Sequence, residues 1–406
     1  MEQFSLEQQA LLALLRQCLW KKPNKLPEQL DWDMLKTLSA QQGVLALAYD
    51  GAVSGNASVP AEMKKLWSQQ TILAVMKNER LLVAQDRLLE QLQQTNIPAV
   101  ILKGSSVAQY YPQPDLRALG DIDVLVPREN LERVKTMLLQ SGYEFHKADH
   151  DFHLGFSRPG AYVEVHYDVT TLPQCRGGDM ARQEIRRFLE CREQGSMGGH
   201  GFPMLCQQHQ ALMLLLHMVR HTLDSGIGLR QLCDWAMYVA TVDPDKWQES
   251  LVPMLERCGL LRYAQVATAA CLHYLGLPQR YAAWCEAVTQ EDACRFMQDL
   301  FLGGNMGRAN PEKIGRLLTS GGVQGDKRSL VKVSLAGLSA YAMQRYPVAK
   351  KHKWLLPFFW IYMPARYWLR SLFGLRKKKS VTQALKDAKT QQSFLEMLDL
   401  FETEDQ

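Results

Sequence analysis

Residues 99–126 read AVILKGSSVAQYYPQPDLRALGDIDVLV, and they predict a small unit of strand, turn, short helix and strand. The apolar run at 99–102 is typical of a short buried strand, and the Gly-Ser pair that follows interrupts it. A short helix is expected at 107–111, and a proline-rich loop comes after it. The segment 121–126 then alternates with the period of two that characterises a second strand.

The residues that follow extend this unit. A helix is predicted over 128–141, because Pro127 suits its first turn and Gly142 stands just past its end. Two more strands are predicted at 152–157 and 161–169, and Arg-Pro-Gly between them has the composition of a hairpin turn. Together these segments predict a compact unit with a mixed sheet.

The flanking regions show helical periodicity instead. Helices are predicted near the N-terminus, at 32–42 and at 61–94, and the chain is expected to return to helix from about residue 182. The clearest later segments are 210–221, 231–241, 262–275 and 382–401. In the helix at 61–94 the stripe expected to be buried comprises Leu66, Leu73, Met76, Leu81, Leu82, Leu88, Leu89 and Leu92.

The predicted fold class is therefore α+β, with a small mixed-sheet core flanked by helical N- and C-terminal regions. The expected boundaries are a helical region at 1–95, a catalytic core at 96–175, a helical domain at 176–320 and a basic amphipathic region at 321–406.

Composition agrees with a packed protein of ordinary character. The 406 residues are 47% hydrophobic and 22% charged, so a sizeable core is available. The nine cysteines form no CxxC pair, which favours buried, reduced thiols over a disulfide framework or a zinc ribbon. Acidic residues near the N-terminus, and no basic stretch before its apolar segment, argue against a targeting signal. A cytoplasmic protein is expected.

Three acidic residues carry the strongest chemical signal. Asp121 and Asp123 stand two apart on a predicted strand, so their side chains point to the same face. Two neighbouring carboxylates repel each other unless a cation compensates them. Glu164 lies in VEVHYDV between Val163 and Val165, and it joins the pair if the two strands are neighbours. An oxygen-only set of ligands suits Mg²⁺ or Mn²⁺, and three carboxylates can hold two ions about 3.5–4 Å apart.

The turn after the first strand is the candidate phosphate site. Gly104 allows the backbone to approach a ligand closely, and the hydroxyl of Ser105 can donate to a phosphate oxygen. A small-residue turn at a helix N-terminus also offers free backbone N–H groups. Lys103 either adds positive charge to this site or covers the edge of the sheet with its aliphatic stem.

The order of these motifs resembles the nucleotidyltransferase superfamily of DNA polymerase β. More narrowly, LKGSSVAQYYPQPDLRALGDIDVLV with VEVHYDVT resembles uncharacterised bacterial nucleotidyltransferase family proteins, from about Leu6 to Asp234. The spacing between Ser105 and Asp121 is longer than in many superfamily members. The role of Ser105 is therefore less firmly implied than that of Asp121.

The resemblance implies a reaction and a set of roles. Asp121 and Asp123 would hold the metal that carries the nucleoside triphosphate, and with Glu164 they would hold a second metal that activates the acceptor. Glu164 could also act as the general base. Gly104 and Ser105 would grip the triphosphate, and pyrophosphate would leave. Such catalysis rests on positioning and charge neutralisation.

Other polar residues admit two interpretations each. Arg117 either touches a phosphate or is a solvated loop residue. His217 and His221 share one helix face, but no third metal ligand is evident. The family resemblance implies that His221, Arg230 and Asp234 line the cleft that faces the catalytic unit, against simple packing as the alternative. Cys206 and Cys233 have no nearby His-Asp arrangement in the sequence, which favours structural thiols over nucleophiles.

A basic region lies near the C-terminus. Residues 327–386 contain fourteen Lys or Arg and no Asp or Glu. Within it, 354–365 is a twelve-residue uncharged run rich in aromatics, too short for the roughly 20 residues that span a bilayer. Three interpretations stay open for residues 350–379: a core helix with solvated basic flanks, contact with an anionic membrane surface at the inner face, and, less favoured, nucleic acid.

The sequence therefore predicts a metal-dependent enzyme that transfers a nucleoside monophosphate from an NTP to an unknown acceptor. One alternative is nucleotide transfer onto a protein side chain, as in toxin–antitoxin modules. Another is a non-catalytic, membrane-associated binding module in surface-polysaccharide assembly, which would not need an intact set of three carboxylates.

Overall fold

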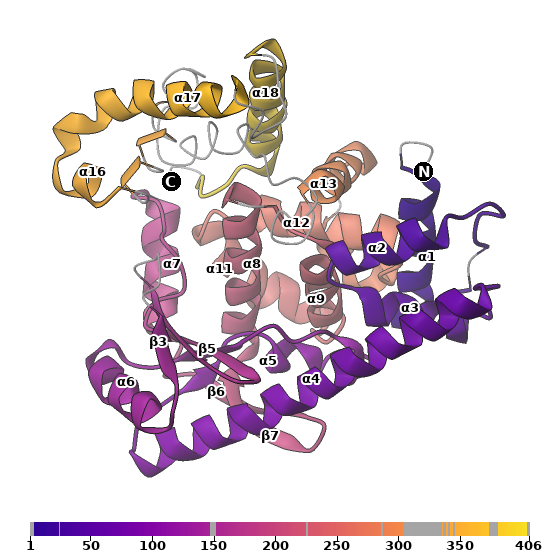
Figure 1. The fold of residues 1–406 in the computed structure, drawn as a ribbon, viewed down its shortest axis with the longest axis horizontal. Coiled ribbons are helices and arrows are strands. Elements are labelled where there is room, and N and C mark those ends of the chain that lie inside the picture. The colour runs from indigo at the N-terminus through magenta and orange to yellow at the C-terminus, as the bar shows by residue number, and fades with distance from the viewer. Residues whose placement is uncertain are drawn as a thin grey trace.

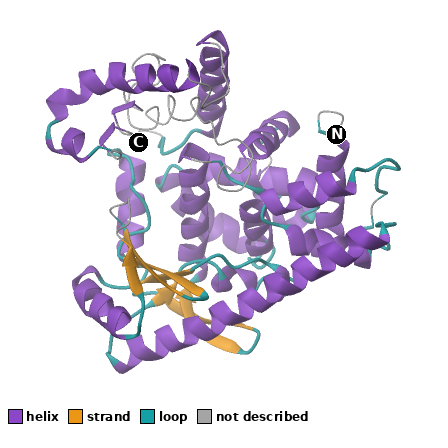
Figure 2. Ribbon diagram, in the orientation of Figure 1, coloured by secondary structure: helices purple, strands orange, loops and turns teal. Residues whose placement is uncertain are grey.

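The computed structural model describes residues 4–23, 25–146, 152–224, 226–285, 287–303, 346–372 and 381–403, with five single positions between 335 and 343. Its architecture is α+β, as predicted, with one mixed sheet and helices before and after it. Figure 2 shows the strands gathered at one end of the molecule and helices over the rest.

The sheet has seven strands in the order β3-β4-β5-β2-β1-β7-β6. Neighbours pair antiparallel except at β2–β5 and β1–β7, which are parallel. The strands are β1 Val100–Ile101, β2 Ile122–Leu125, β3 Glu144–His146, β4 His153–Arg158, β5 Ala161–His166, β6 Arg192–Met197 and β7 His200–Leu205.

The central strands consist largely of apolar residues, and most of these are buried. Every residue of β1 and β2 is buried, and in β5 Val163 and Val165 are fully buried against the helical layer of α4 and α6. The predicted hairpin is confirmed, since Arg158 pairs with Ala161 and Gly160 adopts a φ of 86° in the turn. Because side chains alternate along a strand, Glu164 is left on the opposite face.

The prediction that the chain is helical from residue 182 is wrong for 192–205. There β6 and β7 form an antiparallel hairpin that adds to the sheet beside β1, with Gly198 and Gly199 at positive φ in the turn. Strand β6 reads REQGSM, and four of its six residues are exposed. Its hydrophobic pattern therefore carries no strand signal, and the short exposed β3 was missed for the same reason.

The N-terminal helices are α1 Leu6–Trp20, α2 Trp32–Gln41, α3 Leu45–Ser54 and α4 Ala61–Gln94. Ser5 caps α1, and Gln8 completes a capping box. Helix α3 was not predicted. It packs closely on α1 at Gly51, where a Cβ atom would lie 2.0 Å from the carbonyl oxygen of Leu14. Only glycine permits that approach.

Helix α4 was predicted with its correct bounds, and its predicted buried stripe is confirmed in the second half, at Leu81, Leu82, Leu88 and Leu92, but is wrong in the first half. Leu66, Leu73 and Met76 are 41%, 65% and 48% exposed. The helix serves two cores in turn: its first half buries Trp67 beside α3, and its second half buries the residues from Leu81 to Leu92 against the sheet. Figure 1 shows α4 running from α1–α3 to the sheet.

Short helices border the central strands. Helix α5 covers Ser105–Ala108 rather than the predicted 107–111, because the φ of 77° at Gly104 starts the helical turn two residues earlier. Helix α6 covers Leu131–Gln140, as predicted, after a 3₁₀ turn. The 3₁₀ and π segments are Pro114–Leu116, Arg128–Asn130, Trp247–Leu251, Cys271–Leu275, Gln279–Tyr281, Ala283–Cys285 and Lys353–Leu355.

The later helices are α7 Arg176–Arg186, α8 Gln207–Asp224, α9 Leu229–Val239, α10 Pro244–Lys246, α11 Val252–Arg257, α12 Leu261–Ala270, α13 Gln290–Gly303, α16 Pro347–Lys351, α17 Leu356–Leu372 and α18 Val381–Leu398. The predicted helices α8, α9, α12 and α18 are all present. A large core joins α8–α13 to α1–α3, and Phe394 and Leu398 of α18 pack into it. None of the described helices is long and apolar enough to cross a membrane.

Candidate active site

The three predicted acidic residues meet at the sheet surface. Strands β2 and β5 lie side by side and parallel, with Asp123 directly opposite Glu164 in the register. Asp121 stands two residues before Asp123, immediately ahead of β2. One oxygen from each of the three carboxylates lies within 4.8 Å of the others. The pairing of two strands thus creates the acidic cluster that the sequence only suggested.

The cluster is buried at one end and open at the other. The side chain of Asp123 has no exposed surface, whereas those of Asp121 and Glu164 are 33% and 20% exposed. Solvent therefore reaches two of the three carboxylates, and a ligand could approach from that side.

Lys103 lies among the carboxylates. Its ammonium nitrogen is 2.6 Å from Oδ1 of Asp123 and 3.9 Å from Oδ1 of Asp121. Of the two roles open for this residue, the geometry therefore favours added positive charge. Burial opposes its ionisation, but the charges of Asp121 and Asp123 outweigh burial and raise the pKa of Lys103 above its usual value. Lys103 is therefore a charged partner of the cluster.

His166 is a second partner, to which the sequence analysis assigned no role. Its Nε2 atom lies 3.0 Å from Oδ1 of Asp123 and 3.3 Å from Oε2 of Glu164. Burial opposes its protonation, yet its hydrogen bonds to these two carboxylates raise its pKa. The signal was present in the sequence, because Glu164 and His166 stand two apart on one strand and so share a face.

These partners keep the carboxylates ionised. Burial disfavours the charged form of Glu164, but the hydrogen bond to His166 and the charge of Lys103 lower its pKa to about 2. The pKa of Asp123 is also lowered, since Lys103 and His166 together outweigh its complete burial. Both groups therefore carry a full negative charge near neutral pH.

One carboxylate oxygen of Asp123 makes no hydrogen bond to the described residues. Oδ1 of Asp123 contacts both Lys103 and His166, but Oδ2 is buried and finds no hydrogen-bond partner in the described part of the chain. A buried, charged oxygen without a partner is costly. A cation held by this oxygen together with Asp121 and Glu164 would satisfy it. The same region offers a second grouping, in which His153, Glu164 and His166 place three donor atoms within 4.8 Å.

The Gly-Ser turn differs from the sequence-based expectation in the hydroxyl of its serine, which was expected to be available to a phosphate. Gly104 stands at a φ of 77°, which favours glycine, and a Cβ atom at this position would lie 3.6 Å from the carbonyl oxygen of Asp121. The hydroxyl of Ser105, however, is buried and donates to Oε1 of Gln85 in α4 at 2.7 Å. This bond ties the turn to α4, so phosphate binding by Ser105 through its hydroxyl would require that bond to break.

Cationic residues from α8 and α9 face the acidic cluster. Burial lowers the pKa of both Arg220 and Arg230, and the negative charges that oppose this shift include Glu164 and Asp123 for Arg220 and Asp121 for Arg230. The guanidinium of Arg230 lies 3.9 Å from where a Cβ would stand at Gly120, the residue before Asp121. Its Nη1 atom also donates to the carbonyl of Ala118 at 3.4 Å, so Arg230 packs against the loop that leads into Asp121.

Two further predicted residues have structural partners. Arg117 is neither a phosphate contact nor a solvated residue: it is buried and forms a two-pronged ion pair with Asp234, at 3.0 and 2.6 Å. The hydroxyl of Tyr111 donates to the same aspartate at 2.7 Å. His221 lies with its Nε2 3.1 Å from Nε2 of His217, a contact within α8.

Comparison with known proteins gave a match to one family model. A family model described as "Uncharacterised nucleotidyltransferase" matches residues 28–276. Among solved structures, a nucleotidyltransferase-like antigenic protein from Paracoccidioides brasiliensis is 17% identical, over 50% of this chain and 93% of that one, with a TM-score of 0.35. A likeness at that level supports no argument about function. No curated protein matched the chain.

Proposed function

Because the chain belongs to the family of uncharacterised nucleotidyltransferases, we propose that it transfers a nucleoside monophosphate from an NTP to an acceptor. The observation that carries this proposal is the meeting of Asp121, Asp123 and Glu164 on two adjacent parallel strands. Carboxylates gathered in this way, with solvent on one side, suit the binding of divalent cations and a polyphosphate.

The donor atoms fit magnesium or manganese. All three ligands are carboxylate oxygens, and the free Oδ2 of Asp123 provides a binding position that no described residue uses. When bound as a pair, these ions would neutralise the triphosphate and activate the acceptor for in-line attack. The same ligands would serve Mn²⁺.

The chain's own cations would hold the phosphates. Lys103 already lies within the acidic cluster, and Arg220 and Arg230 face it from α8 and α9. A triphosphate placed between the sheet and these helices would meet positive charge on both sides. The backbone at Gly104 would add close contact, and release of pyrophosphate would end the transfer.

Glu164 is better suited to hold a cation than to accept a proton. A carboxylate with a pKa of about 2 is a weak base near neutrality, and an efficient general base has a pKa closer to the working pH. We therefore assign Glu164 the role of a ligand. His166 would position Asp123 and Glu164 through its two contacts.

The decisive experiment supplies labelled substrates to the whole chain. Each α-³²P-labelled NTP would be incubated with the protein, Mg²⁺ and a metabolite extract, and labelled products would be separated by size. We expect one small labelled product, and a loss of at least about 10²-fold in Asp121→Asn, because one metal ligand is removed. Asp33→Asn, an exposed aspartate of α2, is the matched control. Label on the polypeptide would indicate a protein acceptor, and native turnover in Asp121→Asn would overturn the site.

A separate surface supports a proposal about location. On and just before α17, the side chains of Trp354, Phe358 and Ile361 are 76%, 59% and 74% exposed. Their spacing places them on one helix face, and the exposed Lys351 and Lys353 precede them. We propose that this face rests on an anionic membrane surface, where aromatic side chains and cations are both stabilised. Residues 373–379 of the predicted membrane segment lie outside the described residues.

Flotation with vesicles tests this surface. The whole chain should float with phosphatidylcholine vesicles that contain phosphatidylserine, and the triple variant Trp354→Ser, Phe358→Ser, Ile361→Ser should remain in the soluble fraction. Leu302→Ser removes an equally exposed apolar side chain from α13 and is the control. Equal flotation of the triple variant and the native chain would dispose of the proposal.

A further inference from the structure

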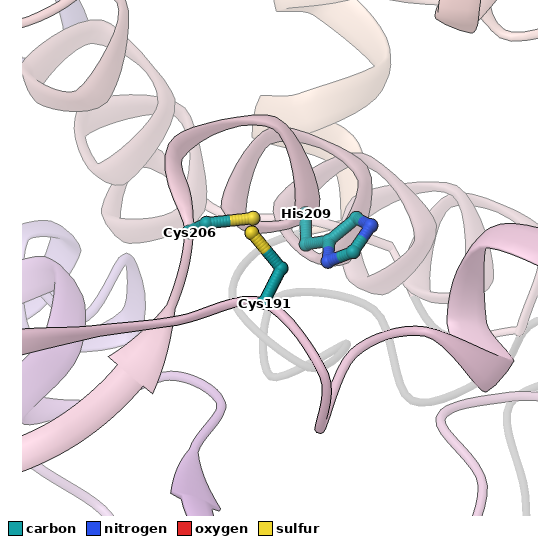
Figure 3. Close-up of side chains that lie close together, drawn as sticks. All are labelled: Cys191, Cys206 and His209. Carbon is teal, nitrogen blue, oxygen red and sulfur yellow. The ribbon is translucent and has the colours of Figure 1, made fainter.

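A second group of metal-ligand side chains lies at the junction of α7, the β6–β7 hairpin and α8. Cys191 precedes β6, Cys206 follows β7, and His209 lies in the first turn of α8. One donor atom from each lies within 4.8 Å of the others. Figure 3 shows the two sulfur atoms next to each other and the imidazole ring beside them.

The hairpin itself brings the cysteines together. Strands β6 and β7 pair with Arg192 opposite Leu205, so the next positions outward are Cys191 and Cys206. The backbone N–H of Cys206 donates to the carbonyl of Cys191 at 3.2 Å, which extends the ladder by one step. Cys206 and His209 then stand three apart at the start of α8, and this spacing turns both toward the same point.

His209 is oriented as metal-binding histidines are. Its side chain is 4% exposed, and its buried Nδ1 has no hydrogen-bond partner within the described ranges. The other ring nitrogen, Nε2, lies 3.6 Å from Oε2 of Glu184 in α7. In metal sites a carboxylate commonly holds the outer nitrogen of a histidine whose inner nitrogen binds the ion. Glu184 has that place here.

The arrangement differs from that of an ordinary buried cysteine. Cys233, Cys258 and Cys271 are buried in the large apolar core, with no set of metal ligands formed around them among the described residues. Cys191 is exposed and faces another thiol and an unpaired imidazole nitrogen. A disulfide between the two cysteines would leave Nδ1 of His209 without a partner, whereas a bound cation would use all three donors.

We propose that Cys191, Cys206 and His209 bind one Zn²⁺ ion through two sulfurs and Nδ1. Mixed sulfur and imidazole ligation suits zinc, and a water molecule on the exposed side of Cys191 would complete four-coordination. Binding would release the two thiol protons to solvent. The ion would join the hairpin to the start of α8, the helix that carries Arg220 toward the acidic cluster. This inference does not depend on the proposed transfer reaction.

Cobalt spectroscopy on the whole chain tests the site. The protein would be purified with a reductant, stripped with a chelator and titrated with Co²⁺ and then Zn²⁺. We expect one cobalt ion per chain with sulfur-to-cobalt charge-transfer absorption in the near ultraviolet, which zinc then abolishes. Cys191→Ser and Cys206→Ser should each weaken this absorption, the variant that carries both changes should lose it, and Glu184→Gln should weaken metal binding by about 10-fold or more.

Two controls separate this site from other metal ligands. Cys294→Ser removes a half-buried thiol elsewhere, and Asp121→Asn removes a ligand of the acidic cluster; both should keep the cobalt–sulfur absorption. The native spectrum needs no variant, so a variant that fails to fold does not obscure the result. The proposal is overturned if the reduced native chain shows no such absorption, or if the absorption persists without both cysteines. A Cys191–Cys206 disulfide in protein kept under reductant would also overturn it.

Discussion

Asp123 is the residue on which the charges of the candidate active site converge. Its Oδ1 atom contacts Lys103 and His166, and its side chain is fully buried. Asp121, two residues earlier, is partly exposed and has only a long contact to Lys103. The two aspartates of one motif therefore differ in burial and in the contacts that they make, although the sequence pattern does not distinguish them.

This difference predicts unequal effects on stability. Asp123→Asn leaves the ammonium of Lys103, whose side chain is 16% exposed, without its closest counter-charge, so we expect the free energy of unfolding to fall by about 3 kcal/mol. Asp121→Asn should cost less than about 1 kcal/mol, because its contact is long and solvent reaches it. Urea denaturation of both variants measures this. Equal losses would show that Lys103 does not depend on Asp123.

His217 is expected to contribute to the pH dependence of stability with a sign opposite to that of His166, whose pKa is raised. Burial, followed by the nearby His221 and the cations Lys103 and Arg220, lowers the pKa of His217 well below its usual value. The unfolded chain, with a histidine pKa of about 6.5, then binds more protons than the folded chain under acid conditions. The stability contributed by neutral His217 is present above about pH 6.5 and is lost as the pH falls below it.

Denaturation between pH 7 and pH 5 tests that sign. We expect the native free energy of unfolding to fall by up to about 1.4 kcal/mol per pH unit from this group, and the fall to be shallower in His217→Gln. His273→Gln removes an exposed histidine and should leave the slope as it was. A slope that His217→Gln does not change would refute the assignment.

At the scale of elements, one buried ion pair connects the strand segment to the helical part. Arg117 lies in the loop between β1 and β2, and Asp234 lies in α9. With Tyr111 on the same carboxylate, the contact fixes the loop that leads into Asp121. A buried pair adds little net stability over apolar packing, but each partner depends on the other. We infer that the ion pair between Arg117 and Asp234 fixes the position of α9 relative to β2.

A double-mutant cycle measures that dependence. Arg117→Met and Asp234→Leu should each lower the free energy of unfolding by about 3–5 kcal/mol, because each leaves a buried partner unpaired. The combination Arg117→Met, Asp234→Leu should cost clearly less than the sum of the single changes. Strict additivity in urea denaturation would mean that the two residues do not act as a pair.

At the scale of the whole molecule, the acidic cluster on the sheet is influenced by cations on helices that come much later in the chain. The cations are Arg220 on α8 and Arg230 on α9, and the carboxylates that their charge reaches belong to the strands β2 and β5 and the residue just before β2. Helix α4 packs into both hydrophobic cores, so it connects the sheet to the helical part of the molecule. A ligand bound between them should stabilise the whole fold rather than the sheet alone.

Metal binding should therefore raise global stability. We expect Mg²⁺ at about 100 times its dissociation constant to add about 2.7 kcal/mol to the free energy of unfolding, and a chelator to reverse the gain. Asp121→Asn should lose most of it, and NaCl of equal ionic strength should not reproduce it in the native chain. The same gain in Asp121→Asn would place the ion somewhere other than the three carboxylates.

Local patterns were enough to predict the fold class, most helices, the central strands and the three acidic residues. Alternation places Glu164 and His166 on one face, and apolar periodicity marks α8, α9 and α12, because these signals depend only on neighbours along the chain. The exposed strands β3 and β6 were not predicted. A strand without an apolar face is stabilised mainly by the neighbouring strand with which it pairs, and the local sequence does not show that pairing.

Long-range contacts decided the rest. Lys103 became a partner of Asp123, Arg117 a partner of Asp234, and Cys191 a neighbour of His209 only when distant segments packed together. Side-chain chemistry and spacing can be read from the sequence, so the sequence was enough to identify the acidic residues as candidate metal ligands. Burial and pairing are properties of the packed fold, and they determine which charges persist and which atoms remain free to bind.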